Sequence, residues 1–134
     1  MNEPRQFQFY QIGMYGCQLL SMIHIAEGET GTYIDAYQTY LALIRKNLLR
    51  TDCYLLDHDP VLNSLTWGKK WVSSLEAPDY VLQSGEHEVQ HWIWQESLST
   101  LHEHYICPDY DPYGASLTVK NGHMQGKRVY RRVV

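Results

Sequence analysis

The chain has 134 residues, 44% of them hydrophobic, which is typical of one globular domain spanning residues 1–134. Its formal net charge of −4 argues against a general nucleic-acid binder, and no apolar run is long enough to cross a bilayer. The polar N-terminus lacks the apolar segment of a signal peptide, so we expect a cytoplasmic protein that does not bind membranes.

The first half of the chain is predicted to be helical. Residues 17–27 are strongly apolar with helical spacing, and Gly28 is the expected end of that helix. A second helix is expected over residues 32–48, where tyrosines and leucines form an apolar stripe. Asp59 and Pro60 resemble an N-cap followed by proline, which predicts a short helix over residues 59–65.

The second half is rich in β-forming residues. Strands are predicted at residues 71–75, 80–83, 89–94 and 101–107, with a final hairpin of 116–120 and 127–134 around Asn121-Gly122. Residues 115–134 hold five Lys/Arg and no acidic residue, which we interpret as a solvated edge hairpin. Helices followed by an antiparallel sheet indicate an α+β fold.

Cys17 differs from the other two cysteines in its surroundings. Cys17, Cys53 and Cys107 form neither an even disulfide set nor a CxxC metal motif, so we expect free thiols and no cofactor. Only Cys17 follows a glycine-containing segment, Gln11-Ile-Gly-Met-Tyr-Gly, and opens an apolar helix. Backbone amides at a helix N-terminus stabilise a thiolate, so Cys17 is a candidate nucleophile.

A thiolate nucleophile needs a base and a group that orients the base. His91 lies on the apolar run Val89-Gln-His-Trp-Ile-Trp, and Asp111 lies in a turn twenty residues later. A carboxylate at that turn is expected to bond an imidazole on the neighbouring strand and fix its tautomer.

The order of Gln11, Cys17, His91 and Asp111 resembles the papain-like cysteine peptidases, most closely small relatives of the bacteriocin-processing double-glycine peptidases. The chain also resembles a family of small papain-like proteins carried by phages and spirochaete plasmids. These resemblances imply Cys17 as nucleophile, His91 as base, Asp111 as its orienting acid and Gln11 as oxyanion donor. The expected substrate is a peptide, isopeptide or side-chain amide. The expected substrate groove is lined by Tyr15, Trp92, Trp94, Tyr110 and Tyr113.

Other interpretations of the same residues stay open. His87 competes with His91 as the base, and Asp109 competes with Asp111 as the acid. The same fold also serves as a non-catalytic binding module in an alternative hypothesis, such as a phage or plasmid accessory protein that captures a host factor. A weaker hypothesis is a zinc site built on His102 and His104, with Cys107, Asp109 and His91 nearby.

Overall fold

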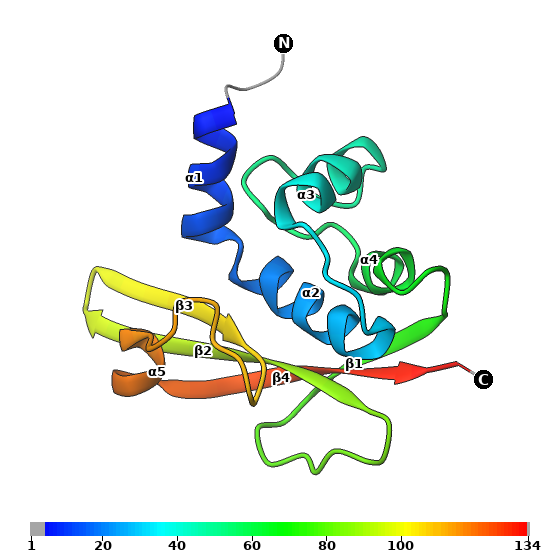
Figure 1. Cartoon of the computed structure of the whole chain (residues 1–134). Helices are drawn as coiled ribbons and strands as arrows, with labels where there is room; N and C mark the ends of the chain where they lie inside the picture. The colour runs from blue at the N-terminus through cyan, green and yellow to red at the C-terminus, as the bar shows by residue number, and fades with distance from the viewer. Residues whose placement is uncertain (1–4, 134) are drawn as a thin grey trace.

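A computed structural model describes residues 5–133, in which four helices precede the first strand (Figure 1). The helices are α1 (Arg5–Tyr15), α2 (Cys17–Thr30), α3 (Ala36–Arg45), α4 (His58–Leu65) and α5 (Leu117–Asn121). The strands are β1 (Trp71–Glu76), β2 (His87–Ser97), β3 (Thr100–Ile106) and β4 (His123–Arg132). The predicted α+β class is confirmed. None of these helices has the length and apolar character that crossing a membrane requires, within residues 5–133.

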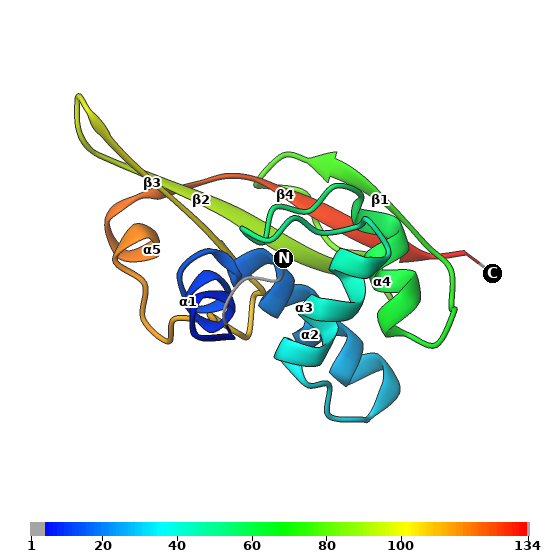
Figure 2. The same ribbon diagram turned by 90° about the horizontal axis from the view of Figure 1, so that it is seen from above.

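The four strands form one antiparallel sheet in the order β1-β4-β2-β3. Helices α2, α3 and α4 lie on one side of it, and the loop of residues 77–86 lies on the other (Figure 1). Figure 2, which looks down from the helix side, shows the β2–β3 hairpin extending beyond the helices. We call the side covered by α2 and α4 the helix face, and the other side the loop face.

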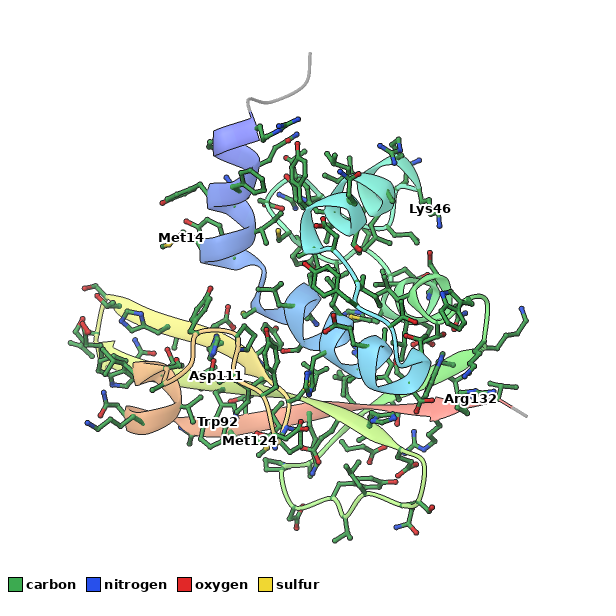
Figure 3. The ribbon with its side chains drawn as sticks, in the orientation of Figure 1. Met14, Lys46, Trp92, Asp111, Met124 and Arg132 are labelled. Atoms are coloured by element: carbon green, nitrogen blue, oxygen red, sulfur yellow. The ribbon has the colours of Figure 1, made fainter. Side chains whose placement is uncertain are left out.

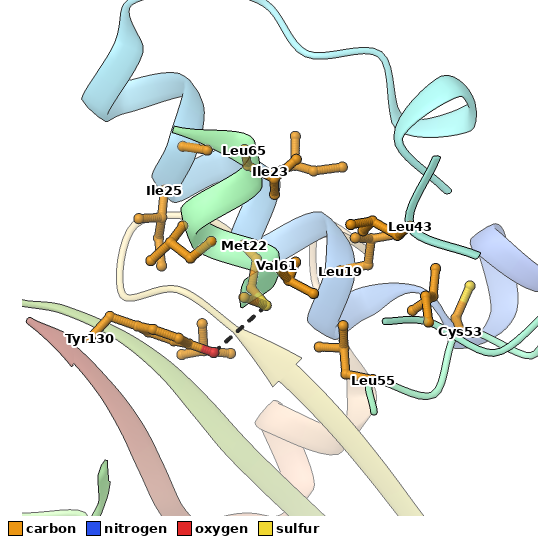
Figure 4. Close-up of a cluster of buried hydrophobic side chains, with 14 of the residues drawn as sticks. Leu19, Met22, Ile23, Ile25, Leu43, Cys53, Leu55, Val61, Leu65 and Tyr130 are labelled. Carbon is orange, nitrogen blue, oxygen red and sulfur yellow. Dashed lines mark hydrogen bonds between the residues drawn. The ribbon is translucent and has the colours of Figure 1, made fainter. Parts of the chain in front are cut away.

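The main core lies between α2 and the helix face of the sheet. Leu19 and Met22 on α2 have no exposed surface, and neither does Tyr130 on β4. The Tyr130 hydroxyl donates to the sulfur of Met22 at 3.6 Å, which satisfies a buried polar group inside the cluster (Figure 4). This contact ties the first half of the chain to its last strand.

Gly16 separates α1 from α2 and determines where α2 begins. Its amide donates to the carbonyl oxygen of Ile12 at 2.9 Å. A Cβ atom at Gly16 would lie 2.3 Å from that oxygen, so the close approach requires glycine. The predicted loop before Cys17 is therefore wrong: residues 5–15 are helical, and only Gly16 interrupts the two helices.

Compared with the sequence pattern, α2 ends later, and α3 begins later and ends earlier. Gly28 lies inside α2, and Gly31, in the left-handed conformation with φ of 67°, caps it instead. The next helix begins after Asp35, whose carboxylate accepts from the Gln38 amide at 2.8 Å, so Thr32 is not its first residue.

Two strand predictions are wrong. Residues 80–83 belong to the 77–86 loop, where the Tyr80 hydroxyl donates to Glu86 at 2.8 Å. Residues 117–121 form α5, capped by the Ser116 hydroxyl, so residues 116–133 do not form the predicted hairpin. Strand β4 lies between β1 and β2 and pairs with both of them, although both are distant from it in sequence.

The basic residues of β4 are consequently not an exposed edge. Lys127 donates to Glu88 at 3.0 Å, and both side chains are buried on the loop face. Arg131 forms ion pairs with Glu86 at 2.5 Å and Glu76 at 3.4 Å. The basic C-terminal segment therefore neutralises acidic residues of β1, β2 and the 77–86 loop.

Candidate active site

Cys17 is the first residue of α2, and its sulfur lies against backbone amides. Hydrogen bonds from the amides of Tyr105, Gln18 and Cys17 itself lower its pKa, as donors to a thiolate do. Tyr105 belongs to β3, an edge strand, and its carbonyl accepts from the Ser21 hydroxyl at 3.4 Å. Cys17 and Ser21, one turn apart, thus bond both outward-facing backbone groups of Tyr105 on β3.

Burial outweighs these donors. Cys17 is 7% exposed, and desolvation raises the pKa of its thiol above the ordinary value of a cysteine. The negative charge of Asp111 raises it further. Burial likewise raises the pKa of Cys53 and Cys107 to about 12. Cys17 is therefore a neutral thiol in this state, placed among donors that favour a thiolate.

Asp111 bonds a histidine, and that histidine is His104. The Nε2 atom of His104 lies 2.6 Å from the Asp111 carboxylate, with side chains that are 1% and 14% exposed. The carboxylate also accepts from the amides of Tyr113 and Ser116 at 2.9 and 3.2 Å. Although burial opposes it, these bonds together with His104 hold the pKa of Asp111 below its ordinary value.

The other ring nitrogen of His104, Nδ1, is buried without a hydrogen-bond partner among residues 5–133. Tyr113 connects this imidazole to the thiol. Its ring stacks on His104 with centroids 4.4 Å apart, and its hydroxyl donates to the Met14 carbonyl at 2.5 Å and lies close to the Cys17 thiol. Burial, with the nearby Cys17, raises the pKa of Tyr113 to about 12. Cys17, Tyr113, His104 and Asp111 thus form one connected cluster.

His91 does not join this cluster. It stacks on Tyr105 at 4.6 Å and bonds Glu103 at 3.1 Å. His91 pairs with Tyr105 in the sheet register, and His104 pairs with Trp92. Because neighbouring residues of a strand point to opposite sides, His91 lies on the helix face and His104 on the loop face. Figure 3 shows Trp92 on the side away from α2, and Asp111 in the loop that follows β3.

The alternative base, His87, and the alternative acid, Asp109, each bond another residue. His87 bonds Glu29 at 2.6 Å, and Asp109 bonds His24 at 3.2 Å beside the His24–Tyr110 stack. The structure therefore pairs neither of them with Cys17. Of the two aspartates, Asp111 is the one whose negative charge raises the pKa of the Cys17 thiol, in addition to burial.

The five aromatic residues expected to form one groove are dispersed. Tyr15 is exposed on α1, and Trp94 stacks on His102 at 4.9 Å near the tip of the β2–β3 hairpin. Trp92 donates to Gln90, on the loop face. Of the five residues, Tyr113 contacts His104 in the cluster around Cys17, and the described contacts of the other four lie elsewhere.

Gln11 lies on α1 and is buried. Its side-chain oxygen Oε1 has no hydrogen-bond partner in the part of the chain that the structure describes. It lies six positions before Cys17, and the chain between them is helical up to Tyr15 instead of the loop expected from the sequence.

The zinc hypothesis finds no ligand set. His104 bonds Asp111, whereas His102 faces Glu96 at 3.4 Å. Among residues 5–133, no group of three or more His, Cys, Asp or Glu side chains is arranged to hold a metal ion.

His104 is the residue that sequence reasoning assigned to the wrong kind of site. Its alternation with His102 suggested metal ligation or solvation. The signal that favours the observed pair is the short segment between His104 and Asp111, which turns after Ile106 through the Cys107–Tyr110 bridge. Such a turn returns the chain toward the strand it has just left.

Comparisons with known proteins give no relative for this arrangement. No family model, no curated protein and no solved structure matches the chain.

Proposed function

We propose that the protein is a papain-like cysteine hydrolase in which Cys17 is the nucleophile, His104 the base and Asp111 the acid that orients the base. The supporting observation is the cluster that connects these three residues through Tyr113. A cysteine at the N-terminus of a helix packed on an antiparallel sheet fits the papain-like arrangement.

The orientation of His104 supports this assignment. Asp111 occupies Nε2 and leaves Nδ1 without a partner, so the neutral tautomer that donates to Asp111 has its lone pair on Nδ1. A base needs that free lone pair to accept a proton from a thiol. The residue expected to be the base, His91, bonds Glu103 and stacks on Tyr105 instead.

The proposed reaction begins with transfer of the Cys17 Sγ proton to Nδ1 of His104. The thiolate attacks the carbonyl carbon of a peptide, isopeptide or side-chain amide, and the amine leaves with the proton from the imidazolium. Water then hydrolyses the thioester, which regenerates the thiol and releases an acid. Backbone amides beside Cys17, with Gln11 as a further donor, stabilise the oxyanion in this proposal.

Tyr113 closes the site in the described state. Its hydroxyl lies close to the Cys17 thiol, which is 7% exposed. A substrate carbonyl needs the space that this hydroxyl occupies, so catalysis requires Tyr113 to swing away from Met14 and Cys17. Tyr113 lies in the loop after β3, where it is held at its outer end by the Met14 carbonyl.

Hydrolysis of p-nitrophenyl acetate tests the proposal, because the acetyl group is transferred to the nucleophile and detected by mass. We expect Cys17→Ser to abolish acetylation at this position, and His104→Gln to slow it about a hundredfold or more. The matched control His91→Gln is expected to stay within about twofold. Circular dichroism confirms that each variant is folded.

The reverse pattern, loss with His91→Gln and not with His104→Gln, would reject His104 as the base. Unchanged hydrolysis in Cys17→Ser would reject the hydrolase altogether. The second candidate, a non-catalytic binding module of phage or plasmid origin acting in the cytoplasm, then takes precedence. The burial of the Cys17 thiol and its raised pKa favour that candidate.

A further inference from the structure

A cavity of about 370 Å³ lies on the helix face, beside the cluster around Cys17 but separate from it. Its walls come from α2, α4, the segment before α4 and the four strands, with Tyr105 as the residue from β3. The polar residues of the lining include Gln18, His58, His91 and Arg128. The volume falls in the range of small-molecule sites. None of Cys17, His104 and Asp111 lines it.

Arg128 supplies a positive charge to this cavity and forms no direct ion pair with a carboxylate among residues 5–133. It donates to the neutral Ser73 hydroxyl at 3.0 Å. Within residues 5–133, the ion pairs of β4 involve Lys127 and Arg131, and none involves Arg128. A half-buried guanidinium that lacks a carboxylate retains donors for an anionic ligand.

The acidic residues near the cavity are already bonded to protein groups. Glu76 pairs with Arg131 and accepts from Ser74 at 2.6 Å. Glu103 bonds His91. Asp59 accepts from both the hydroxyl and the amide of Ser73, at 2.5 and 3.3 Å. The Ser73 hydroxyl that donates to Asp59 also accepts from Arg128, so the guanidinium reaches this carboxylate only through Ser73. Its remaining N–H groups are left for a ligand.

The rest of the lining suits an apolar or aromatic body. Val89 and Leu55 are buried at the wall, and the Tyr105 ring stacks on His91 there. At the rim, Tyr54 and Leu75 are 61% and 74% exposed, which leaves apolar surface in contact with solvent. Polar groups at one position and an apolar wall elsewhere are the usual features of a small-ligand site.

The Gln18 amide adds a second polar contact. Its Nε2 atom lies 2.9 Å from Nε2 of His58, so the amide donates to the imidazole and its oxygen is oriented by that bond. Both side chains are lining residues, together with Arg128. The cavity lining therefore includes an amide held by His58 as well as a charged donor.

From these contacts we propose that the cavity binds a small carboxylate whose body is aromatic or aliphatic. The guanidinium of Arg128 holds the carboxylate, and Tyr105, Val89 and Leu55 contact the body. The planar guanidinium matches a carboxylate with two parallel hydrogen bonds, which favours this anion. The site does not depend on the proposed hydrolase, because Cys17 does not line it.

The test uses three carboxylates as probes: benzoate, 4-phenylbutyrate and hexanoate. Each is titrated into the full chain to about 10 mM and followed by amide chemical shifts, especially those of Gly126 and Val89. We expect saturable shifts at cavity residues, and binding of 4-phenylbutyramide, the neutral isostere, about tenfold weaker than that of 4-phenylbutyrate.

Arg128→Gln is expected to weaken carboxylate binding about tenfold or more, whereas Arg132→Gln is expected to leave it within about twofold. Arg132 is a matched control because it lies on the same strand, is exposed and stacks over Trp71 outside the cavity. Cys17→Ser is expected to bind like the original chain, so failure of the hydrolase proposal leaves this result unaffected.

Three results overturn the proposal: no saturable shift with any of the carboxylates, equal affinity for the amide and the acid, or equal binding by Arg128→Gln and Arg132→Gln. The amide comparison needs no variant, so it decides the question even if Arg128→Gln is unfolded. Phenyl phosphate distinguishes the anion, and stronger binding of the phosphate than of the carboxylates rejects the carboxylate assignment.

Discussion

Two histidine–carboxylate pairs lie on opposite faces of the β2–β3 hairpin, and Asp111 of one pair comes from the loop after β3. On the loop face, His104 and Asp111 are 2.6 Å apart and almost fully buried. On the helix face, His91 and Glu103 are 3.1 Å apart, and the glutamate is 57% exposed. The first pair is additionally bonded by two backbone amides at Asp111, whereas the Glu103 carboxylate has solvent around it.

This contrast teaches that the proximity of an imidazole and a carboxylate is not enough to identify a site. A buried pair held by several donors has one geometry, and removal of either member leaves the other unsatisfied. An exposed pair is screened by water and contributes little to stability. The two pairs therefore predict different responses to the same substitution.

The largest difference is expected in stability. Asp111→Ala removes the acceptor of three hydrogen bonds, so we expect the free energy of unfolding to fall by about 2–4 kcal/mol. Glu103→Ala removes one exposed partner and is expected to change it by about 0.5 kcal/mol or less. Urea unfolding followed by circular dichroism measures both, and equal losses would erase the contrast between the pairs.

A second difference concerns access to the thiol. Tyr113 covers Cys17, so Tyr113→Ala is expected to accelerate alkylation of Cys17 by iodoacetamide about tenfold. The control Tyr110→Ala removes a ring that stacks on His24. It should leave the Cys17 rate unchanged.

Peptide mapping after alkylation separates Cys17 from Cys53 and Cys107, whose pKa of about 12 keeps them slow. In the original chain, Cys17 itself should react more slowly than a free cysteine near pH 7, since burial raises its pKa. Rapid alkylation of Cys17 without any substitution would contradict a site closed by Tyr113.

The smallest difference is expected in the dependence of stability on pH. The pKa of Asp111 is lower in the folded chain than in the unfolded chain, so the carboxylate stabilises the fold above its unfolded pKa. That contribution should decline as the pH falls from about 4 through the folded pKa of Asp111. Comparing acid unfolding curves measures it.

Asp111→Asn should flatten the acid limb of this curve, because the variant has no carboxylate to protonate. Glu103→Gln makes the same change of charge on the other face and should retain the steep limb due to Asp111. If stability falls equally steeply with acid pH in both variants, the hydrogen bonds to Asp111 do not control its ionisation.

Several features of the fold were predictable from the sequence because they depend on local patterns. The apolar run beginning at Cys17 predicted α2, and the β-forming residues of 89–94 and 101–107 predicted β2 and β3. These segments need little more than periodicity and propensity. The prediction that free thiols occur at Cys17, Cys53 and Cys107 also agrees with the structure.

The site was only partly predictable for a reason of geometry. Cys17 and Asp111 were identified from their local settings, but the choice between His91 and His104 depends on which face of the hairpin the following loop covers. The two histidines belong to different strands, so their faces depend on the register of β2 with β3, which alternation along either strand does not give. Non-local packing of Tyr113 against Met14 decides that question.

The prediction of a C-terminal hairpin was wrong for a related reason. Asn121 and Gly122 are a strong local turn signal, which predicted a hairpin. Ser116 caps a helical turn there instead, and Gly122 lies against the Ile93 backbone so closely that a Cβ would be 2.0 Å from its carbonyl oxygen. Pairing with β1 and β2 therefore outweighed the local preference.

The strand order has a consequence for how the chain is made. β4 is synthesised after the other three strands, yet it lies between β1 and β2. While residues 123–132 are still inside the ribosome, β1 has no neighbour and one edge of β2 is open. The nascent helices can form early, but the sheet can close only after the final strand emerges, which exposes the partly folded chain to aggregation until that moment.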